Sequence, residues 1–434
     1  MKIDVAGLKI DAIGKADLLN QITERIKAKQ KTFVVTPYSE FLYASLIDRE
    51  VKRLLNSADF SVADGIGILW AERFLALPLT WPHYWLRVAQ AWGQVAVTGA
   101  EILLHPKSLY KTIPEKIVGA DLIWDLAELA SKNSFRVFLL GGRGEVGKIA
   151  ADKLKERFPD LIIAGTSNKE HVDSSIIEDI NSCRTDMVLV AFNPLEQEKW
   201  IARNLSQLTA SFAIGLGGTF DYIVGHKKQP PRFMRDIGLE WLFRLVTQPS
   251  RLVRIYRGVW GLTLALVRLK VINTLPYREN GCAVVINEKN LVFLGKRVHS
   301  KHIGPDHANH YRDYWQFPQG GLDAEEDPVA GTTRELEEET GISSVNVIGT
   351  AKYHHQYVWN NAVTPIFHRY FKYKGQLQHT VFFRFTGSDS EINLDHDELV
   401  DHRWVGIDEV EGIIAPERRE HARIVLAELK ELLV

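Results

Sequence analysis

The sequence predicts an α/β protein of two domains, the first built on a mostly parallel sheet with helices on both faces. The chain has 434 residues, whereas a single hydrophobic core stops growing at roughly 250–300 residues. Six short runs are rich in β-branched or apolar residues: 33–36, 60–63, 136–140, 161–165, 186–191 and 211–215. Helical periodicity separates most of these runs, and such alternation is typical of a Rossmann-like sheet.

Several residues directly follow the predicted strands, and ligands collect at the carboxyl ends of parallel strands. They are Thr36, Asp64, the pair Gly141-Gly142 and the run from Gly215 to Gly218, which we expect to meet at one edge of the sheet. Asp64 stands before a helix, where its carboxylate could act as a general base or could cap that helix. The glycines permit close backbone approach to a nucleotide diphosphate, although tight turns also use glycine.

The composition, with 45% hydrophobic and 25% charged residues, excludes the disordered and fibrous classes. A formal net charge of −1 gives no global attraction to nucleic acid or to a membrane. Cys183 and Cys282 lie about a hundred residues apart, so we expect neither a disulfide framework nor a CxxC metal site. A reducing cytoplasm fits this usage, and the N-terminus has no signal-peptide pattern, so export is not expected.

The most apolar stretch lies at 81–104 and has the length of a membrane span, but its charged and amide residues argue against spanning. On a helix, Trp85, Val88, Trp92 and Val95 would share one face. Such a face suits either a membrane headgroup region or an ordinary core or dimer contact.

A basic, aromatic-bearing segment closes the first domain. Between residues 227 and 270 it carries ten cations against two carboxylates, which favours helices lying on an anionic membrane over a solvated helical face. We expect a first domain over 1–272, with a helical appendage at about 226–272. The pattern then changes to strands, so we place the boundary near 271–279 and a second domain over 277–434.

The second domain contains the complete pattern G-x5-E-x7-R-E-U-x-E-E-x-G-U, in which U is apolar. Its fixed residues are Gly320, Glu326, Arg334, Glu335, Glu338, Glu339 and Gly341, and Leu336 and Ile342 fill the apolar positions. This segment is identified as a Nudix motif, and the resemblance implies an α/β/α fold with a mixed sheet. A solvated acidic helix would explain the glutamates but not the glycines and the arginine at fixed offsets.

The glutamates at 335, 338 and 339 fall at i, i+3 and i+4 of a helix and therefore share one face. Their oxygens suit Mg²⁺ or Mn²⁺, which would neutralise a diphosphate and activate a water molecule, while Arg334 would orient the carboxylates. The catalytic candidates are Glu338 and Glu339.

The segments YWQFPQGGLDAEED and YKGQLQHTVFFRF resemble RNA 5′-pyrophosphohydrolases and diadenosine polyphosphate hydrolases. This resemblance implies a nucleoside diphosphate-linked substrate, and a further metal ligand at Glu398 unless that residue is a plain surface glutamate. RNA is the secondary alternative as a partner, because the second domain has no obvious basic stripe.

The first domain resembles the TagA/WecG/CpsF glycosyltransferases through seven segments in the same order. They are VVTPYSEFLYA, NSADFSVADGIGILWAERFL, VGADLIWDL, FLLGG, FNPLEQEKWIARN, AIGLGGTFDYIVG and GLEWLFRLVTQPSRLVRIYRG. The resemblance implies inverting transfer of an N-acetylmannosamine-type sugar from a UDP donor to a polyprenyl-diphosphate-linked amino sugar. It also implies no metal cofactor for this domain, and no D-x-D pair occurs before residue 275.

The resemblance also assigns roles to residues. Asp64 becomes the catalytic base, and Thr36 binds the acceptor or the donor. Gln197 and Glu198 match a motif beside the donor, although they could equally form the exposed first turn of a helix. The other implied substrate-binding residues are Gly141, Gly142, Gly217, Gly218, Arg244, Arg251 and Arg254. The arginines belong to the appendage, where a planar guanidinium group suits a diphosphate.

Two departures from the family pattern put the donor in question: Tyr38 replaces an asparagine, and Glu196 stands where a lysine is common. A third departure is an insertion at about 78–113, which holds the Trp-rich stretch and could add a second membrane contact. The family implies self-association. Together, the two resemblances predict a bifunctional enzyme on the inner face of the cell membrane. We also expect it to be a homo-oligomer. The alternatives are a Nudix hydrolase with a membrane-docking first domain and a transferase regulated by nucleotide sensing.

Overall fold

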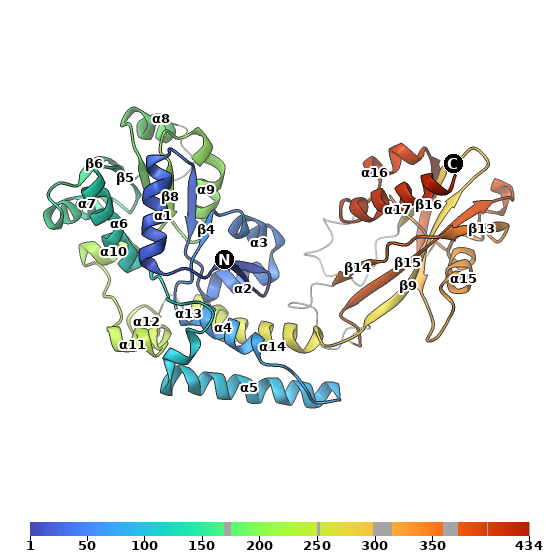
Figure 1. Cartoon of the computed structure of the whole chain (residues 1–434), viewed down its shortest axis with the longest axis horizontal. Helices are drawn as coiled ribbons and strands as arrows, with labels where there is room; N and C mark the ends of the chain where they lie inside the picture. Colours follow the sequence, from blue (N-terminus) through green and yellow to red (C-terminus); the bar gives the residue numbers. More distant parts are fainter. Residues whose placement is uncertain (169–174, 250–251, 298–314, 359–371, 397, 434) are drawn as a thin grey trace. The chain divides into compact units, whose positions relative to one another are not determined.

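The computed structural model describes the whole chain except residues 169–174, 250–251, 298–314, 359–371, 397 and 434. The chain forms two compact units, Met1–Val271 and Ile272–Val434 (Figure 1). Each unit has its own sheet and its own buried clusters, so each is described by itself.

The first unit is built on a six-stranded parallel sheet with the order β4-β3-β8-β7-β5-β6. Its strands are β3 (Thr32–Val35), β4 (Phe60–Ser61), β5 (Arg136–Gly141), β6 (Ile162–Ser167), β7 (Met187–Ala191) and β8 (Phe212–Gly215). A separate hairpin joins β1 (Lys2–Val5) to β2 (Leu8–Asp11). The six strands lie within a few residues of the six predicted runs, which confirms the predicted mostly parallel sheet.

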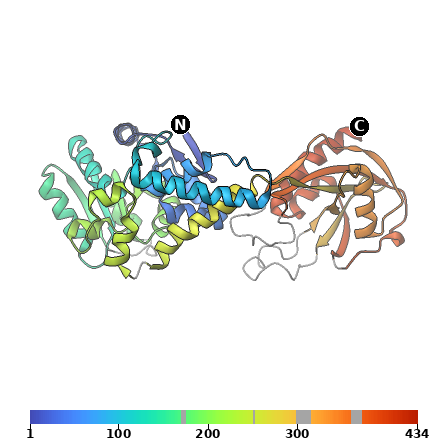
Figure 2. The ribbon, with the colours of Figure 1, turned by 90° about the horizontal axis from the view of Figure 1, so that it is seen from below.

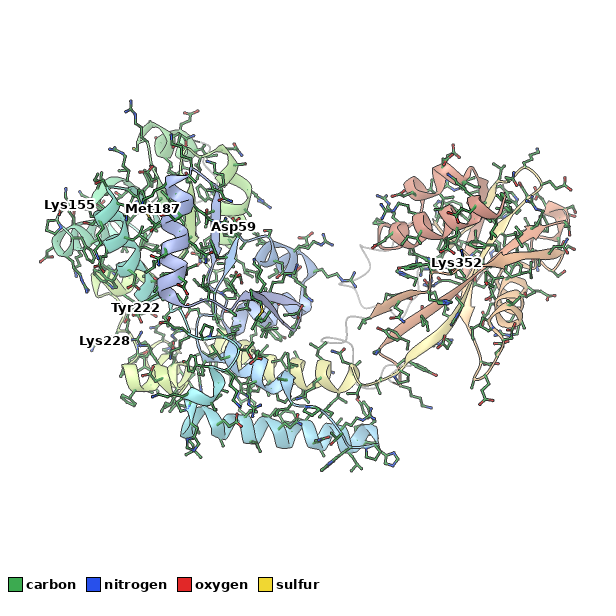
Figure 3. All side chains as sticks on the ribbon, viewed as in Figure 1. Asp59, Lys155, Met187, Tyr222, Lys228 and Lys352 are labelled. Carbon is green, nitrogen blue, oxygen red and sulfur yellow. The ribbon has the colours of Figure 1, made fainter. Side chains whose placement is uncertain are left out.

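Both faces of this sheet are buried. In β7, Met187 and Leu189 belong to one core cluster with helices α1, α6 and α7, whereas Val188 and Val190 are buried on the opposite face. Figure 3 shows Met187 inside the unit, while Lys155 and Lys228 are exposed. A strand that is buried on both sides reads as a continuous apolar run, and this is why the strands could be located from sequence.

The helices of the first unit fall into two groups. The sheet is flanked by α1 (Lys15–Lys27), α2 (Ser39–Ile47), α3 (Arg49–Asn56), α4 (Ile66–Ala76), α6 (Gly119–Asn133), α7 (Val146–Arg157), α8 (Ser175–Ser182), α9 (Glu196–Asn204) and α10 (Thr219–Val224). The insertion contributes α5 (Tyr84–Leu104) and the short η1 (Pro106–Leu109), and η2 (Leu205–Gln207) follows α9. The appendage contains α11 (Arg232–Asp236), α12 (Glu240–Thr247), α13 (Leu252–Tyr256), η4 (Arg257–Gly261) and α14 (Leu262–Ile272).

Helix α5 is not a core helix, since only Ala91 and Thr98 are buried along its length. It runs beside α14 in two perpendicular views (Figures 1 and 2). None of the helices in the described ranges is both long and apolar enough to cross a membrane.

The second unit contains an eight-stranded mixed sheet in which β15 pairs with β9 in parallel and the other pairs are antiparallel. Its strands are β9 (Tyr277–Ile286), β10 (Val292–Arg297), β11 (Trp315–Gln316), β12 (Gln319–Gly321), β13 (Val345–Thr350), β14 (His355–Val358), β15 (Gly375–Phe385) and β16 (Leu399–Val405). Its helices are α15 (Pro328–Thr340), α16 (Val410–Ile413) and α17 (Arg419–Leu432), with short turns η5 (Asp389–Glu391), η6 (Ile407–Glu409) and η7 (Pro416–Arg418).

Separate core clusters lie on the two faces of this sheet, one including residues of α17 and the other residues of α15. This arrangement confirms the predicted α/β fold with a mixed sheet.

Candidate active sites

A cavity of about 1000 Å³ opens at the carboxyl ends of the parallel strands of the first unit. It is lined by ten of the predicted residues: Thr36, Asp64, Gly141, Gly142, Gln197, Glu198, Gly217, Gly218, Arg244 and Arg254. The eleventh, Arg251, falls outside the described residues. Segments that are far apart in the sequence therefore meet at one edge of the sheet, as expected for this topology.

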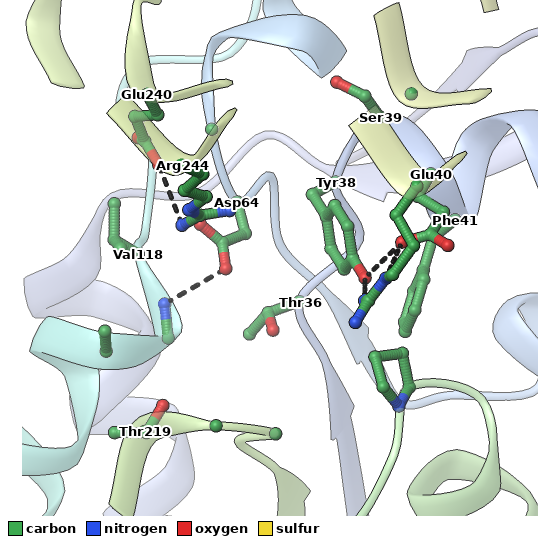
Figure 4. Close-up of a pocket in the computed structure, with 18 of the residues that line it drawn as sticks. Thr36, Tyr38, Ser39, Glu40, Phe41, Asp64, Val118, Thr219, Glu240 and Arg244 are labelled. Carbon is green, nitrogen blue, oxygen red and sulfur yellow. Dashed lines mark hydrogen bonds and ion pairs between the residues drawn. The ribbon is translucent and has the colours of Figure 1, made fainter. Parts of the chain in front are cut away.

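Asp64 and Thr36 face each other across the N-terminus of α6 (Figure 4). The Gly119 amide donates to Asp64 Oδ2 over 3.3 Å. A methyl group placed on Gly119 would lie 3.5 Å from Thr36 Oγ1 and 3.6 Å from Asp64 Oδ2, so both oxygens border the same small space. Asp64 does not cap the helix that follows it, because α4 begins at Ile66 after Gly65.

Desolvation is the largest influence on the pKa of the Asp64 carboxyl. Burial raises its pKa to about 7, and the nearby Glu240 carboxylate acts in the same direction. The Gly119 amide and the Arg244 guanidinium oppose this increase only in part. A carboxylate with a pKa near neutrality can take up and release a proton under physiological conditions, which is what general-base chemistry requires.

The glycines of the cavity are required by the backbone. Gly141 and Gly142 have φ values of +102° and +83°, and a side chain on Gly141 would meet the Ala191 carbonyl at 2.5 Å. They open a strand–turn–helix element in which residues 142–147 read G-x-G-x-x-G. Gly147 completes it, since a methyl group there would lie 2.8 Å from the Gly141 carbonyl. Such a turn can cradle a diphosphate at a helix N-terminus.

Of these glycines, only Gly141 and Gly142 were predicted from the sequence to belong to the site. The missed signal was the spacing of Gly142, Gly144 and Gly147 directly after a predicted strand. This spacing becomes meaningful only in that strand–turn–helix context.

Gln197 and Glu198 are buried, so neither forms an exposed first turn. The Gly217 amide donates to Gln197 Oε1 over 2.8 Å, and Gln197 Nε2 donates to Glu198 Oε1. Glu198 also accepts from the Leu195 amide over 2.7 Å, at a residue with φ of +69°. Burial raises the pKa of Glu198 to about 7. Both side chains thus line the cavity while their polar atoms hold its glycine turn in place.

Two arginines of the appendage approach the cavity with carboxylate partners. Arg244 pairs with Glu240 over 3.0 Å, and its buried Nε has no hydrogen-bond partner within the described part of the chain. Arg254 donates to Glu40 Oε2 over 2.9 Å and to the Tyr38 hydroxyl over 2.8 Å (Figure 4). Tyr38 in turn donates to Glu40 over 3.0 Å, which completes a triad that sequence reasoning did not foresee.

In the second unit, Arg334 is the centre of the Nudix segment. It contacts Glu326 through two nitrogens, over 3.1 and 3.0 Å, and reaches Glu335 over 3.0 Å and Glu338 over 3.1 Å. One guanidinium group therefore contacts three carboxylates of the motif, and its orienting role stays a prediction.

Steric and backbone constraints explain why glycine stands at two fixed positions of the motif. A side chain on Gly320 would overlap the Glu335 carboxylate, and Gly341 ends α15 with φ of +73°. Only glycine adopts the latter conformation without strain.

Glu339 differs from its neighbours because it is buried and accepts from the Gln319 amide over 3.0 Å. Burial raises its pKa to about 8, and the charges of Glu398 and Glu335 act in the same direction. Glu398 itself is exposed, just before β16. Its influence on Glu339 nevertheless places it within electrostatic reach of the motif.

The expected convergence of the glutamate side chains differs from the structure. Over the ranges that the structure describes, no group of three His, Cys, Asp or Glu side chains is close enough to hold a metal ion. The helix does place Glu335, Glu338 and Glu339 on neighbouring turns, but Arg334 draws the first two toward itself while Glu339 turns to a backbone amide.

The chain thus combines a cavity lined by glycines, arginines and carboxylates in one α/β unit with a carboxylate-rich helix in another. Residues 3–86 and 84–276 match the glycosyl transferase WecG/TagA/CpsF family, and residues 276–428 match the NUDIX domain. The chain therefore belongs to the WecG/TagA/CpsF family and carries a C-terminal NUDIX domain, which confirms both resemblances. It is an enzyme with a glycosyltransferase domain and a Nudix hydrolase domain.

Curated relatives match the first domain. The chain is 26% identical over 263 residues to an N-acetylglucosaminyldiphosphoundecaprenol N-acetyl-beta-D-mannosaminyltransferase of Staphylococcus aureus (strain MRSA252), covering 58% of this chain and 88% of the relative. It is 27% identical over 227 residues to the protein of the same name from Bacillus subtilis (strain 168), covering 52% and 75%.

Solved structures match the second domain. A MutT protein from Methanosarcina mazei Go1 is 18% identical with a TM-score of 0.26, covering 36% of this chain and 97% of that one. A C. elegans Ap4A hydrolase complex is 16% identical with a TM-score of 0.25, covering 35% and 98%.

Proposed function

We propose that the first domain transfers an N-acetylmannosamine-type sugar from a UDP donor to a polyprenyl-diphosphate-linked amino sugar, with inversion, in surface glycan synthesis. We propose that the second domain hydrolyses a nucleoside diphosphate-linked compound. The observation that carries the first proposal is Asp64, a carboxylate with a pKa near 7 beside Thr36 in the cavity that the glycine turns and appendage arginines also line. The names of the curated relatives supply the sugar and the lipid.

In this mechanism Asp64 takes the proton from the acceptor hydroxyl as that oxygen attacks the sugar carbon and UDP leaves from the opposite face. Thr36 Oγ1, which borders the same space, positions the attacking group. Backbone amides of the turn 141–147 and the guanidinium of Arg244 stabilise the leaving diphosphate. These groups supply positive charge without a metal ion.

For the second domain, the chemistry of the donor set fits a divalent cation, although the described carboxylates are not gathered into a three-ligand group. The donors are carboxylate oxygens, which Mg²⁺ and Mn²⁺ prefer, and the buried Glu339 lies within electrostatic reach of Glu335 and Glu398. Glu335, Glu338, Glu339 and Glu398 would hold the ion. When bound, it neutralises diphosphate charge and activates water. Arg334 hydrogen-bonds both Glu335 and Glu338, and these bonds would have to rearrange for the two carboxylates to bind the ion.

We further propose that the enzyme acts as a peripheral protein on the cytoplasmic, anionic face of the cell membrane. In the appendage, α12 and α13 have no buried residues over their described positions, yet they carry large apolar side chains among cations. Such surfaces bind anionic bilayers by burying apolar area and attracting headgroups. Self-association remains a prediction from the family.

A crossed assay tests both activities. The transferase is assayed with UDP-N-acetylmannosamine and a lipid-linked N-acetylglucosamine acceptor, and the hydrolase with Mg²⁺ on dinucleoside polyphosphates, UDP-sugars and 5′-triphosphate RNA. We expect Asp64→Asn to lose only transfer and Glu338→Gln to lose only hydrolysis. Transfer is measured in the Glu338→Gln background, because a hydrolase that consumes UDP-sugar would otherwise distort it.

Each alternative gives a different result in this assay. Hydrolysis without transfer would leave the Nudix domain as the enzyme and the first domain as a docking module. Transfer without hydrolysis of any substrate would point to nucleotide sensing by the second domain.

A further inference from the structure

The inserted helix α5 supplies one wall of the transferase cavity. Trp92, Val95, Gly99 and Ile102 line it, and their spacing of three and four residues places them on one helix face. This face extends over eleven residues, from Trp92 to Ile102, or about 15 Å along the helix axis. The cavity around Asp64 therefore has an additional apolar wall, for which the proposed sugar-transfer chemistry has no use.

The appendage supplies a second apolar wall. Ile255, Val259 and Leu262 line the same cavity as the α5 face. Trp92 and Trp260, which also line it, remain 41% and 62% exposed. Large apolar side chains that are both cavity-lining and exposed mark a surface that is open to an apolar ligand.

Polar contacts fix α5 in this position. Trp70 Nε1 donates to the buried Thr98 hydroxyl over 2.9 Å, and Arg73 pairs with Glu101 over 3.1 Å. Lys270 donates to Gln94 Oε1 over 2.6 Å. Because the partners lie on α4 and α14, the helix is held against both the sheet unit and the appendage. These contacts hold the apolar wall in a defined position beside the cavity.

The lining of this cavity combines two kinds of chemistry. Arg244, Arg254 and the glycines 141 and 142 suit an anionic diphosphate, whereas the α5 face and the segment 255–262 supply apolar side chains. An amphiphile with a diphosphate head and a long hydrocarbon chain matches that combination.

We propose that the α5 face and the segment from Ile255 to Leu262 form a groove for the isoprenoid chain of the lipid acceptor. This proposal rests on the proposed transferase function and adds the residues that recognise the lipid. Burial of isoprene units in the groove stabilises the complex in proportion to the apolar surface removed from water. An acceptor with a long chain is therefore bound more tightly than one with a short chain.

Two glycines of α5 provide a matched test. Gly99 lines the groove and Gly93 does not, and a Cβ atom added at either position would meet no atom within 4 Å. Phenylalanine is also a better helix former than glycine, so neither substitution weakens the helix. Gly99→Phe fills the groove, and Gly93→Phe adds the same ring to the same helix outside it.

We expect Gly99→Phe to raise KM at least tenfold for a long-chain polyprenyl acceptor, with kcat nearly unchanged and with no effect on a water-soluble short-chain acceptor. Gly93→Phe should leave both acceptors unaffected. The proposed lipid groove would be refuted if the two variants changed KM equally, or if Gly99→Phe changed KM equally for both acceptors.

A binding measurement separates this proposal from the transferase function. Crosslinking of a photoreactive polyprenyl phosphate in detergent micelles needs no turnover, and we expect it to label the groove and to decrease in Gly99→Phe only. Labelling without any sugar transfer would refute the function but retain the groove. Transfer without labelling, or labelling that is equal in Gly99→Phe and Gly93→Phe, would refute the groove alone.

Discussion

Replacing Asp64 by Asn should stabilise the first domain at high pH while abolishing transfer. Burial raises the pKa of Asp64 from 3.8 to about 7. Between these values the folded state binds more protons than the unfolded state, so wild-type stability falls as pH rises through this window. Integrating from pH 5 to pH 8 gives about 2.5 kcal/mol, an upper value because water enters the cavity. Asn avoids this cost and can still accept from the Gly119 amide.

The assay is thermal unfolding of wild type and variant at pH 5 and pH 8. The difference in Tm should grow by roughly 5 °C between the two pH values, in favour of the variant. Asp17→Asn on the exposed face of α1 is the control and should show no such growth. A Tm difference that does not change with pH would refute the raised pKa of the Asp64 carboxyl. Transfer should fall by about 10²–10⁴-fold in Asp64→Asn, and wild-type kcat/KM should rise with pH through about 7.

Three further substitutions probe other parts of the sites. Gly320→Ala should lower hydrolysis at least tenfold and leave transfer intact, because the methyl group displaces the Glu335 carboxylate; unchanged hydrolysis would contradict this packing. Gly147→Ala should raise KM for the UDP donor several-fold in steady-state assays, since its methyl group would press on the Gly141 carbonyl at 2.8 Å; an effect on the acceptor alone would count against a donor site there. Tyr38→Phe removes a hydroxyl bonded to Arg254 and Glu40, and should change acceptor KM more than kcat; equal changes in both would point to a direct chemical role.

The sheet of the first unit could be predicted because its strands are buried on both faces and therefore read as apolar runs. The positions of Thr36 and Asp64 followed from the same logic, since the carboxyl ends of parallel strands share an edge. The helix of the Nudix motif could also be predicted from the sequence, because few structures other than this motif explain glycines, an arginine and glutamates at these fixed offsets.

Long-range polar contacts could not be predicted. Arg254 and Glu40 are 214 residues apart, and nothing local in either segment indicates their pairing. The capture of Glu335 and Glu338 by Arg334 was missed for a different reason: periodicity defines a shared helical face, but side-chain direction depends on the charges around it. The burial of Gln197 and Glu198 could not be predicted from the sequence either, since polar residues at the start of a helix are usually exposed.

The ion pairs of the appendage bear on how the transferase cavity binds an anion. Arg244 and Arg254 are each paired with a carboxylate, and the four side chains are between 20% and 37% exposed. Partly exposed pairs contribute about 0–1 kcal/mol, so exchanging Glu40 or Glu240 for a ligand costs little. A diphosphate offers more charge and can accept two hydrogen bonds from one guanidinium, which favours the exchange. The carboxylates thus keep both arginines at the cavity before a ligand arrives, and the Tyr38 hydroxyl adds a neutral contact to Arg254 that can persist when Glu40 is replaced.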